Sequence, residues 1–220
     1  MLLGRETGGS TIDAREMLRA VPFTARNPRV VFNAWYLSHH QKVDVGYGTW
    51  VSGWVNVALA ARSSVSIGDG LFVPRSMEIR GNDDGRIVIG DNVTIDSGAR
   101  LHVANKAHLS IGDRVGIGPY NIFNAFDDLT VGDDTMFAPF VNINCADHGM
   151  EMGVPMREQY GTYGPVTIGR DCWLGAMVVV TRGVTIGDGA VIGAGSVVTR
   201  DIPPYTIAAG APCCALKERE

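Results

Sequence analysis

The chain has 220 residues, of which 45% are hydrophobic and 19% are charged, a composition typical of one or two globular domains. Its formal net charge of −4 lacks the polybasic character of nucleic-acid-binding proteins, so we expect no nucleic-acid partner. No apolar run reaches about 18 residues, and no basic start precedes an apolar stretch, so we expect neither a membrane span nor a signal peptide.

The four cysteines, Cys145, Cys172, Cys213 and Cys214, show none of the spacings that build a zinc site, and we expect no metal. A disulfide between the adjacent Cys213 and Cys214 would be strained. We therefore predict free thiols in a reducing compartment, the cytoplasm.

The first 60 residues predict a short helix followed by an irregular capping segment. Residues 10–21 have a possible Ser or Thr cap and end at Pro22, as a helix does. Residues 23–60 hold three of the four tryptophans and several glycines, without a regular period. We interpret them as irregular first coils or as a cap over the open end of a repetitive core, whose terminal coil would otherwise expose unpaired backbone groups.

A period of six appears from Ser64, loosely at first, and is unbroken between Val166 and Val198. In that stretch an aliphatic residue returns every six positions and is usually followed by a small one. A helix would give a period of 3.6 and an ordinary strand a period of 2. Hexapeptide repeats are typical of a β-helix, in which three units make a triangular coil of about 18 residues. The sequence therefore predicts an all-β fold with a β-helix over 61–204 and a C-terminal tail over 205–220.

The spacing of one recurring motif locates the insertions in this β-helix. The motif is an aliphatic residue followed by Gly, and usually by Asp; it begins at Ile67, Ile89, Ile111, Val131, Ile168 and Ile186. Successive separations are 22, 22, 20, 37 and 18, which exceed one 18-residue coil by 4, 4, 2, 19 and 0. The small excesses predict insertions at corners. The excess of 19 predicts a long loop at 146–164, and a loop of that length in a regular solenoid is usually functional.

His148 stands where the chain leaves the predicted coil. Catalytic groups favour loops that are held by a rigid scaffold. An imidazole with an ordinary pKa of about 6.5 suits a general base at neutral pH. His148 is therefore the candidate catalytic residue. The flat faces of a triangular coil also favour a closed symmetric oligomer, most simply a homotrimer.

The stretch 131–217 resembles the hexapeptide-repeat acyltransferases, closest to the O-acetyltransferases of sugars and surface polysaccharides. The residues that carry the resemblance are Asp-His-Gly at 147–149, Pro155 and Gln159 in the loop, the run GPVTIGRDCWLGA at 164–176 and the repeats of 183–213. The resemblance implies a left-handed parallel β-helix and a trimer with acetyl-CoA bound between neighbouring subunits.

The resemblance also implies a mechanism and a set of site residues. His148 would take the proton from an acceptor hydroxyl, whose oxygen would attack the thioester directly, without an acyl-enzyme. The implied cofactor contacts are small residues along the pantetheine arm and basic residues near the phosphates: Ala138, Ala176, Ala194, Thr199, Arg200 and Lys217. The implied substrate contacts are Asn121, Asp128 and Trp173, for which corner turns or packing are equally plausible roles.

The implied function is transfer of an acetyl group from acetyl-CoA to a sugar hydroxyl in lipopolysaccharide, capsule or other surface-polysaccharide biosynthesis. The alternatives are an N-acetyltransferase of a nucleotide-linked amino sugar, a serine acetyltransferase and a non-catalytic β-helix scaffold. A γ-type carbonic anhydrase fits poorly, because two of its zinc-binding histidines are five residues apart and Ile143 and Gly153 occupy those positions around His148.

Overall fold

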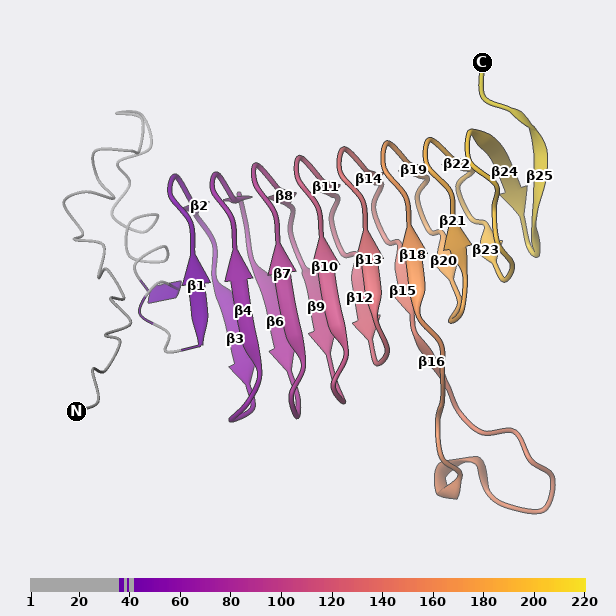
Figure 1. Cartoon of the computed structure of the whole chain (residues 1–220), viewed down its shortest axis with the longest axis horizontal. Helices are drawn as coiled ribbons and strands as arrows, with labels where there is room; N and C mark the ends of the chain where they lie inside the picture. The colour runs from indigo at the N-terminus through magenta and orange to yellow at the C-terminus, as the bar shows by residue number, and fades with distance from the viewer. Residues whose placement is uncertain (1–35, 38, 40–41) are drawn as a thin grey trace, which may run out of the picture.

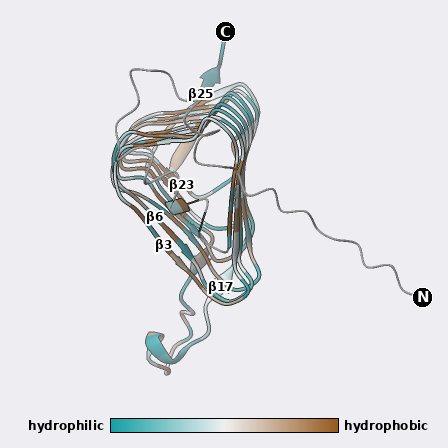
Figure 2. Ribbon diagram, turned by 90° about the vertical axis from the view of Figure 1, so that its left-hand side faces the viewer, coloured by the Kyte–Doolittle hydropathy of each residue, from teal (hydrophilic) through white to brown (hydrophobic). Residues whose placement is uncertain are grey.

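The structure, a computed structural model, describes residues 36, 37, 39 and 42–220. The helix that the sequence predicts at 10–21 lies outside these residues. The described chain winds into stacked coils, each of which gives one short strand to each of three parallel sheets (Figure 1). Viewed along the stack, the coils follow one another around a three-sided outline (Figure 2). The predicted all-β parallel β-helix is confirmed, and its left-handed winding stays a prediction.

We call the three faces sheets A, B and C, in the order in which the chain visits them. Sheet A holds β1 (Val43–Val45), β4 (Ser64–Ile67), β7 (Arg86–Ile89), β10 (His108–Ile111), β13 (Leu129–Val131), β18 (Val166–Ile168) and β21 (Thr185–Ile186). Sheet B holds β2 (Trp50–Val51), β5 (Phe72–Val73), β8 (Thr94–Ile95), β11 (Gly116–Ile117), β14 (Met136–Phe137), β19 (Trp173–Leu174), β22 (Val191–Ile192), β24 (Thr206–Gly210) and β25 (Cys213–Glu218). Sheet C holds β3 (Val55–Leu59), β6 (Met77–Gly81), β9 (Ala99–Val103), β12 (Ile122–Ala125), β15 (Asn142–Asn144), β20 (Val179–Val180) and β23 (Val197–Val198).

The aliphatic residues of the repeated motif stack on one another inside sheet A. Each pairs in register with its equivalent one coil away. All six are at most 3% exposed: Ile67, Ile89, Ile111, Val131, Ile168 and Ile186. A coil has too little interior to bury these side chains alone, so stacking creates one continuous core. The predicted register is confirmed at every step, including the long one from Val131 to Ile168.

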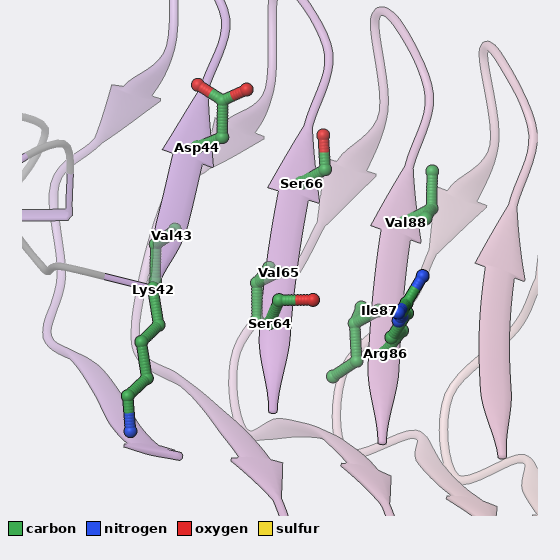
Figure 3. A pocket seen from close by; sticks show the side chains of 9 residues that line it. All are labelled: Lys42, Val43, Asp44, Ser64, Val65, Ser66, Arg86, Ile87 and Val88. Carbon is green, nitrogen blue, oxygen red and sulfur yellow. The ribbon is translucent and has the colours of Figure 1, made fainter. Parts of the chain in front are cut away.

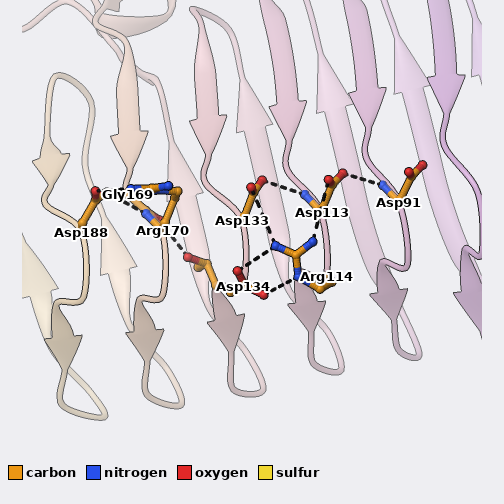
Figure 4. Close-up of polar contacts among 9 residues, drawn as sticks. Asp91, Asp113, Arg114, Asp133, Asp134, Gly169, Arg170 and Asp188 are labelled. Carbon is orange, nitrogen blue, oxygen red and sulfur yellow. Dashed lines mark hydrogen bonds and ion pairs between the residues drawn. The ribbon is translucent and has the colours of Figure 1, made fainter.

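The Gly-Asp pair that follows the aliphatic residue builds the corner between sheets A and B. The Asp91 N–H donates to a carboxylate oxygen of Asp113 at 2.8 Å, and the Asp113 N–H donates to Asp133 at 2.9 Å (Figure 4). Each carboxylate thus satisfies a backbone donor of the preceding coil. A Cβ at Gly90 would stand 2.4 Å from the Asp113 carboxylate, so the close approach requires glycine there.

Within the described residues, coils already form from Val43, inside the segment that the sequence suggests to be irregular first coils or a cap, and ahead of the boundary expected at residue 61. Val43 and Val45 pair in parallel with Val65 and Ile67, and β3 pairs with β6. The pair Val45-Gly46 precedes Ile67-Gly68 by 22 residues. The two following steps of the motif, from Ile67 to Ile89 and from Ile89 to Ile111, have the same length. The motif was missed because Tyr47, rather than Asp, follows the glycine.

The C-terminal tail extends sheet B. Strand β24 pairs in parallel with β22, and β25 then turns back and pairs antiparallel with β24. Arg219 holds the end of the chain, because its guanidinium donates to the Asp171 carboxylate at 2.9 Å and to the Gly189 carbonyl at 3.1 Å. The tail therefore covers the sheet B edge of the last coil, where the parallel stacking ends.

One hairpin interrupts the coils, between β15 and β18. Its arms, β16 (Ala146–Asp147) and β17 (Thr162–Tyr163), pair antiparallel, and its outer part contains the short 3₁₀ helix η2 (Met156–Glu158). In Figure 1 the hairpin hangs away from the stack, while the coils on either side of it stay in contact. Leu129 still pairs with Val166, and Ile143 pairs with Val180. The insertion therefore leaves the core continuous.

We predict that Phe123→Ala destabilises the protein by about 3–5 kcal/mol. Phe123 is 0% exposed and packs edge-on against Phe137 at a ring distance of 5.0 Å, so the change leaves a cavity in the core. Denaturant unfolding followed by circular dichroism measures the loss. Val88→Ala is the matched control, because Val88 is 48% exposed on β7 and should change stability by less than about 0.5 kcal/mol. Equal losses in the two variants would contradict the stacked core.

Candidate active site

The root of the hairpin is held to the solenoid on both arms. The Cys145 N–H donates to the Asn124 carbonyl at 3.0 Å, and the Gly164 N–H donates to the Cys145 carbonyl at 3.1 Å. The Asp147 carboxylate accepts a hydrogen bond from Nε of Arg182, on the next coil, at 2.8 Å. The backbone that enters His148 is therefore fixed by contacts to both neighbouring coils.

His148 is the first residue beyond the paired arm β16, and its side chain is exposed. Among the described residues, none hydrogen-bonds to its imidazole, whereas the carboxylate of the preceding Asp147 is already bound to Arg182. A solvent-facing imidazole on a fixed backbone can accept a proton from a bound molecule. His148 therefore stays the candidate general base.

The outer part of the hairpin is hydrogen-bonded within itself, and it exposes apolar side chains beside the charged Arg157 and Glu158. Gln159 ties it together: its amide nitrogen donates to the carbonyls of Glu151 and Val154, and its amide oxygen accepts the Glu151 N–H, at 2.8–2.9 Å. The side chains that face outward are more than half exposed: Met150, Met152, Met156 and Tyr160. Flexible Met side chains of this kind adapt to a contact surface.

Three asparagines on the outer face of sheet C lie at the approach to the hairpin, and the sequence analysis missed them. Asn124 Nδ2 donates to Asn144 Oδ1 at 2.8 Å, and Asn144 Nδ2 donates to Asn142 Oδ1 at 3.0 Å. A signal was present in the alternation Asn142-Ile143-Asn144, which directs both amides outward just before the chain leaves the coil. This asparagine row ends on β15, the strand after which the chain enters the hairpin.

Of the three predicted substrate residues, Asn121 serves a corner instead. It is 1% exposed; its amide nitrogen donates to the Gly118 carbonyl at 3.0 Å, and its amide oxygen accepts the Val141 N–H at 2.5 Å. A buried amide with both groups satisfied by backbone fits the turn role that the sequence left open. It has no exposed atom to offer a sugar, and Asn124 on the next strand faces outward in its place.

Asp128 lies beside the hairpin root, whereas Trp173 lies on another face of the solenoid. The Asp128 carbonyl accepts the Val166 N–H at 2.9 Å, which places this residue beside the root, and its carboxylate accepts the His108 N–H at 2.8 Å. Trp173 is 41% exposed on sheet B, whereas the hairpin leaves from the corner between sheets C and A. The structure therefore brings Asp128, but not Trp173, to the hairpin of its own chain.

The predicted cofactor residues fall on three separate surfaces of one chain. Ala138, Ala176 and Ala194 follow β14, β19 and β22, at the corner between sheets B and C. Thr199 and Arg200 are exposed at the corner between sheets C and A, just after β23. Lys217 is exposed on β25, opposite Ile207 in sheet B. No single face of one chain presents all six.

Sheet A carries a shallow depression that does not belong to this site. It spans the first three coils and is lined by Lys42, Asp44, Ser64, Ser66, Arg86 and Val88, among others (Figure 3). Lys42 already donates its ammonium group to the carbonyls of Leu59 and Ala60, at 3.3 and 2.6 Å. The hairpin leaves two coils further along, after β15, so this depression has no contact with His148.

Three of the four thiols are buried and unreactive. Burial raises the pKa of Cys145 to about 12, and burial also raises the pKa of Cys172 and of Cys213. These thiols are protonated at neutral pH, and the thiolate is the nucleophilic form. They therefore cannot serve as acyl carriers in the folded protein. Only Cys214 is exposed.

We predict that a maleimide reagent labels one thiol rapidly in the folded protein and all four after denaturation, because only Cys214 is exposed. Mass spectrometry counts the labels and locates them. Cys214→Ser should abolish the fast phase. Rapid labelling of Cys145 in the folded protein would contradict its burial and reopen a thiol nucleophile beside the hairpin.

Within residues 42–220, no three His, Cys, Asp or Glu side chains converge in a group that could hold a metal ion. The described residues likewise contain no helix with the length and apolarity needed to cross a membrane.

Comparison with known proteins identifies the class to which this fold belongs, a parallel solenoid with an inserted hairpin and an exposed histidine at its root. The family model "Hexapeptide repeat of succinyl-transferase" matches residues 165–200. A putative lipopolysaccharide biosynthesis O-acetyltransferase of Escherichia coli is 33% identical to this chain, over 62% of the chain and 74% of that protein. The chain belongs to the hexapeptide-repeat acyltransferase family.

Two further curated relatives are longer than the matched region. A probable acetyltransferase of Mycobacterium tuberculosis is 36% identical over 75% of this chain, which spans 53% of that protein. The galactoside O-acetyltransferase of Escherichia coli is 39% identical over 55% of this chain, with 62% of that protein covered. The chain thus spans between half and two thirds of the length of these two relatives.

Solved structures share the fold. An N-acyltransferase of Bacillus cereus, crystallised with an amino sugar nucleotide and coenzyme A, superimposes with a TM-score of 0.57 at 20% identity, over 80% of this chain and 84% of that one. The polysialic-acid-specific acetyltransferase NeuO gives a TM-score of 0.55 at 24% identity, over 80% and 85% of the two chains. At these identities the likeness extends to the fold alone.

Proposed function

We propose that this protein is an acetyl-CoA-dependent O-acetyltransferase that acetylates a sugar hydroxyl in the biosynthesis of lipopolysaccharide or another surface polysaccharide. Family membership supports acyl transfer, and two of the relatives are named as O-acetyltransferases, one of galactosides and one in lipopolysaccharide biosynthesis. The observation that carries the proposal is the exposed His148 on a hairpin root that is clamped by the 2.8 Å contact between Asp147 and Arg182.

His148 is the general base in this proposal. Acetyl-CoA supplies an acetyl group that is activated as a thioester. The imidazole takes the proton of the acceptor hydroxyl as its oxygen forms the new ester bond and the carbon–sulfur bond breaks. The imidazolium then returns the proton to the departing thiolate. The buried, protonated thiols support direct transfer, because they leave no cysteine nucleophile beside the hairpin.

The asparagine row and Asp128 are the proposed acceptor contacts. Asn124 and Asn144 face outward on sheet C, and their amides are linked to each other, so their remaining donors and acceptors are held in place. Asp128 lies beside the root, at the corner between sheets C and A of the coil that precedes the hairpin. Groups of this kind recognise sugar hydroxyls, and rigid placement lowers the entropy lost on binding.

The cofactor residues support a homotrimer with sites between subunits. The three alanines at the corner between sheets B and C would let the pantetheine arm lie close to one copy. Thr199 and Arg200 stand at the corner between sheets C and A, so a second copy would bring them to the same cofactor. Lys217 and Arg200 provide positive charge for the phosphates. Trp173 would then meet the hairpin of a neighbouring copy, which has an apolar surface of exposed Met and Tyr side chains.

We expect analytical ultracentrifugation to give three times the mass of the chain at micromolar concentration. Met152→Ser together with Tyr160→Ser should shift the protein toward the monomer, because these side chains are 98% and 96% exposed on the hairpin and would lose apolar contact area. A wild-type protein that stays monomeric would remove the shared-site arrangement.

We expect His148→Ala to lower kcat for acetyl transfer by about 100-fold or more, because the hydroxyl loses its base. Thiol release from acetyl-CoA, measured against a panel of sugars, lipopolysaccharide fragments and nucleotide-linked amino sugars, identifies the acceptor. His108→Ala is the matched control, since His108 is also exposed but lies on sheet A. A kcat for His148→Ala within about tenfold of wild type would contradict the base role. Turnover of an amino sugar alone would favour N-acetyl transfer.

A further inference from the structure

The outer face of sheet C carries a cluster of charged side chains that the proposed mechanism does not use. In β6 and β9, alternate residues point outward: Glu78 and Arg80 on one strand, Arg100 and His102 on the next. The strands lie in the order β6, β9, β12, β15, so this cluster and the asparagine row share one face (Figure 1). Arg80, His102, Asn124 and Asn144 stand in register, one on each successive coil.

Glu78 holds the two arginines side by side. One of its carboxylate oxygens accepts Nε–H of Arg80 at 2.5 Å, and the other accepts Nε–H of Arg100 at 2.8 Å. The hydrogen bond from Arg100, followed by that from Arg80, lowers the pKa of Glu78, so its carboxylate is ionised at neutral pH. Two guanidinium groups share one carboxylate, which leaves one net positive charge.

The terminal nitrogens of both guanidinium groups are free to bind a ligand. Both contacts to Glu78 use Nε, and within residues 42–220 the Nη atoms of Arg80 and Arg100 have no acceptor. The two side chains are 47% and 40% exposed, so solvent reaches them. Paired Nη donors match the planar or tetrahedral oxygens of a carboxylate or phosphate, and Glu78 fixes them in advance.

His102 extends the cluster toward the asparagine row as a neutral, ordered group. Burial, and the positive charges of Arg100 and Arg80, lower the pKa of His102 below its ordinary value. Its Nε2 lies 3.2 Å from the Asn82 amide, and its ring packs edge-on against Phe126 at 5.1 Å. The neutral imidazole therefore adds no charge, and the positive charge stays concentrated on the two arginines.

We propose that the Arg80–Glu78–Arg100 cluster binds an anionic group, a carboxylate or a phosphate, of an extended acceptor whose hydroxyl end reaches His148. Arg100 is two strands and Arg80 three strands from β15, which at the usual strand spacing is roughly 10 and 14 Å. That distance is longer than one sugar ring. The acceptor is thus an acidic oligosaccharide or a sugar joined to a phosphate, rather than a small neutral sugar. The proposal rests on the proposed acetyl transfer.

The test compares charged and uncharged acceptors with arginine variants. The acceptors are a glucuronate-containing tetrasaccharide, the same tetrasaccharide with its carboxyl groups reduced to alcohols, and a nucleoside diphosphate hexose. For the double variant Arg80→Gln, Arg100→Gln we expect kcat/KM to fall by about tenfold or more with at least one anionic acceptor, mainly through KM. The reduced tetrasaccharide should change by less than about twofold. Which anionic acceptor is affected distinguishes a carboxylate from a phosphate.

Two control variants separate this role from a structural one. Arg80→Lys with Arg100→Lys keeps the charge but loses the planar fork, and should give an intermediate loss. Arg114→Gln removes another ion-paired arginine, which contacts Asp134 at 2.6 Å on the corner between sheets A and B, and it should leave all three acceptors unaffected. Equal losses with charged and neutral acceptors, or no loss with either anionic one, would overturn the proposal.

Calorimetry separates failure of this proposal from failure of the proposed function. If no acceptor is acetylated, titration with the glucuronate tetrasaccharide and the nucleoside diphosphate hexose still tests the cluster. Binding that is lost in the double glutamine variant and weakened by salt supports the anion site. Absence of binding by the wild-type protein overturns it. Acetyl transfer that needs His148 but is indifferent to both arginines overturns the anion site alone.

Discussion

The stacking of inward aliphatic side chains, coil upon coil, is the constraint on which the rest of this structure depends. Each inward residue is buried only because its equivalent stands one strand spacing away, so every coil must return to the same register. Additions to the sequence must therefore preserve that register. The four-residue insertions lengthen sheet C strands such as β6 and β9 together with the corner that follows them, and the long insertion between Val131 and Ile168 leaves the coil altogether and rejoins it in register.

This constraint also explains why the candidate chemistry stands at the hairpin root. A loop on a rigid stack is held most firmly where it departs, and here backbone hydrogen bonds and the ion pair between Asp147 and Arg182 fix both arms. His148 follows the last paired residue, so its imidazole is free while its backbone is held. The outer hairpin, in contrast, carries exposed Met and Tyr side chains that suit contact with another copy.

The three faces differ in the side chains that they expose. Sheet A is a mixed polar surface with a shallow depression, and sheet B exposes large apolar side chains such as Phe72, Met136 and Trp173. Sheet C combines the asparagine row with the pair of arginines held by Glu78, on the face that leads to the hairpin. A parallel solenoid makes such rows simple to build, because equivalent positions of successive coils face the same way at a constant spacing.

The sequence by itself determined the fold and its register, since a period of six and the separations between Ile-Gly pairs translate directly into coils. It also predicted the long loop, which the structure shows as a hairpin, and it singled out His148 as the candidate base, which stays a prediction. It placed the start of the regular repeats at residue 61, whereas coils form from Val43, because the first coil lacks the Asp that builds the later corners. It gave Asn121 a substrate role, and the structure shows that side chain buried at a corner. Only the tertiary structure decided which polar residues share a face: Glu78 and Arg100 are 22 residues apart in the chain, yet they meet because their strands are neighbours. The physical reason is that the period fixes which side chains point inward and pack, whereas contacts between outward side chains depend on the coil-to-coil register and on which donors remain unpaired.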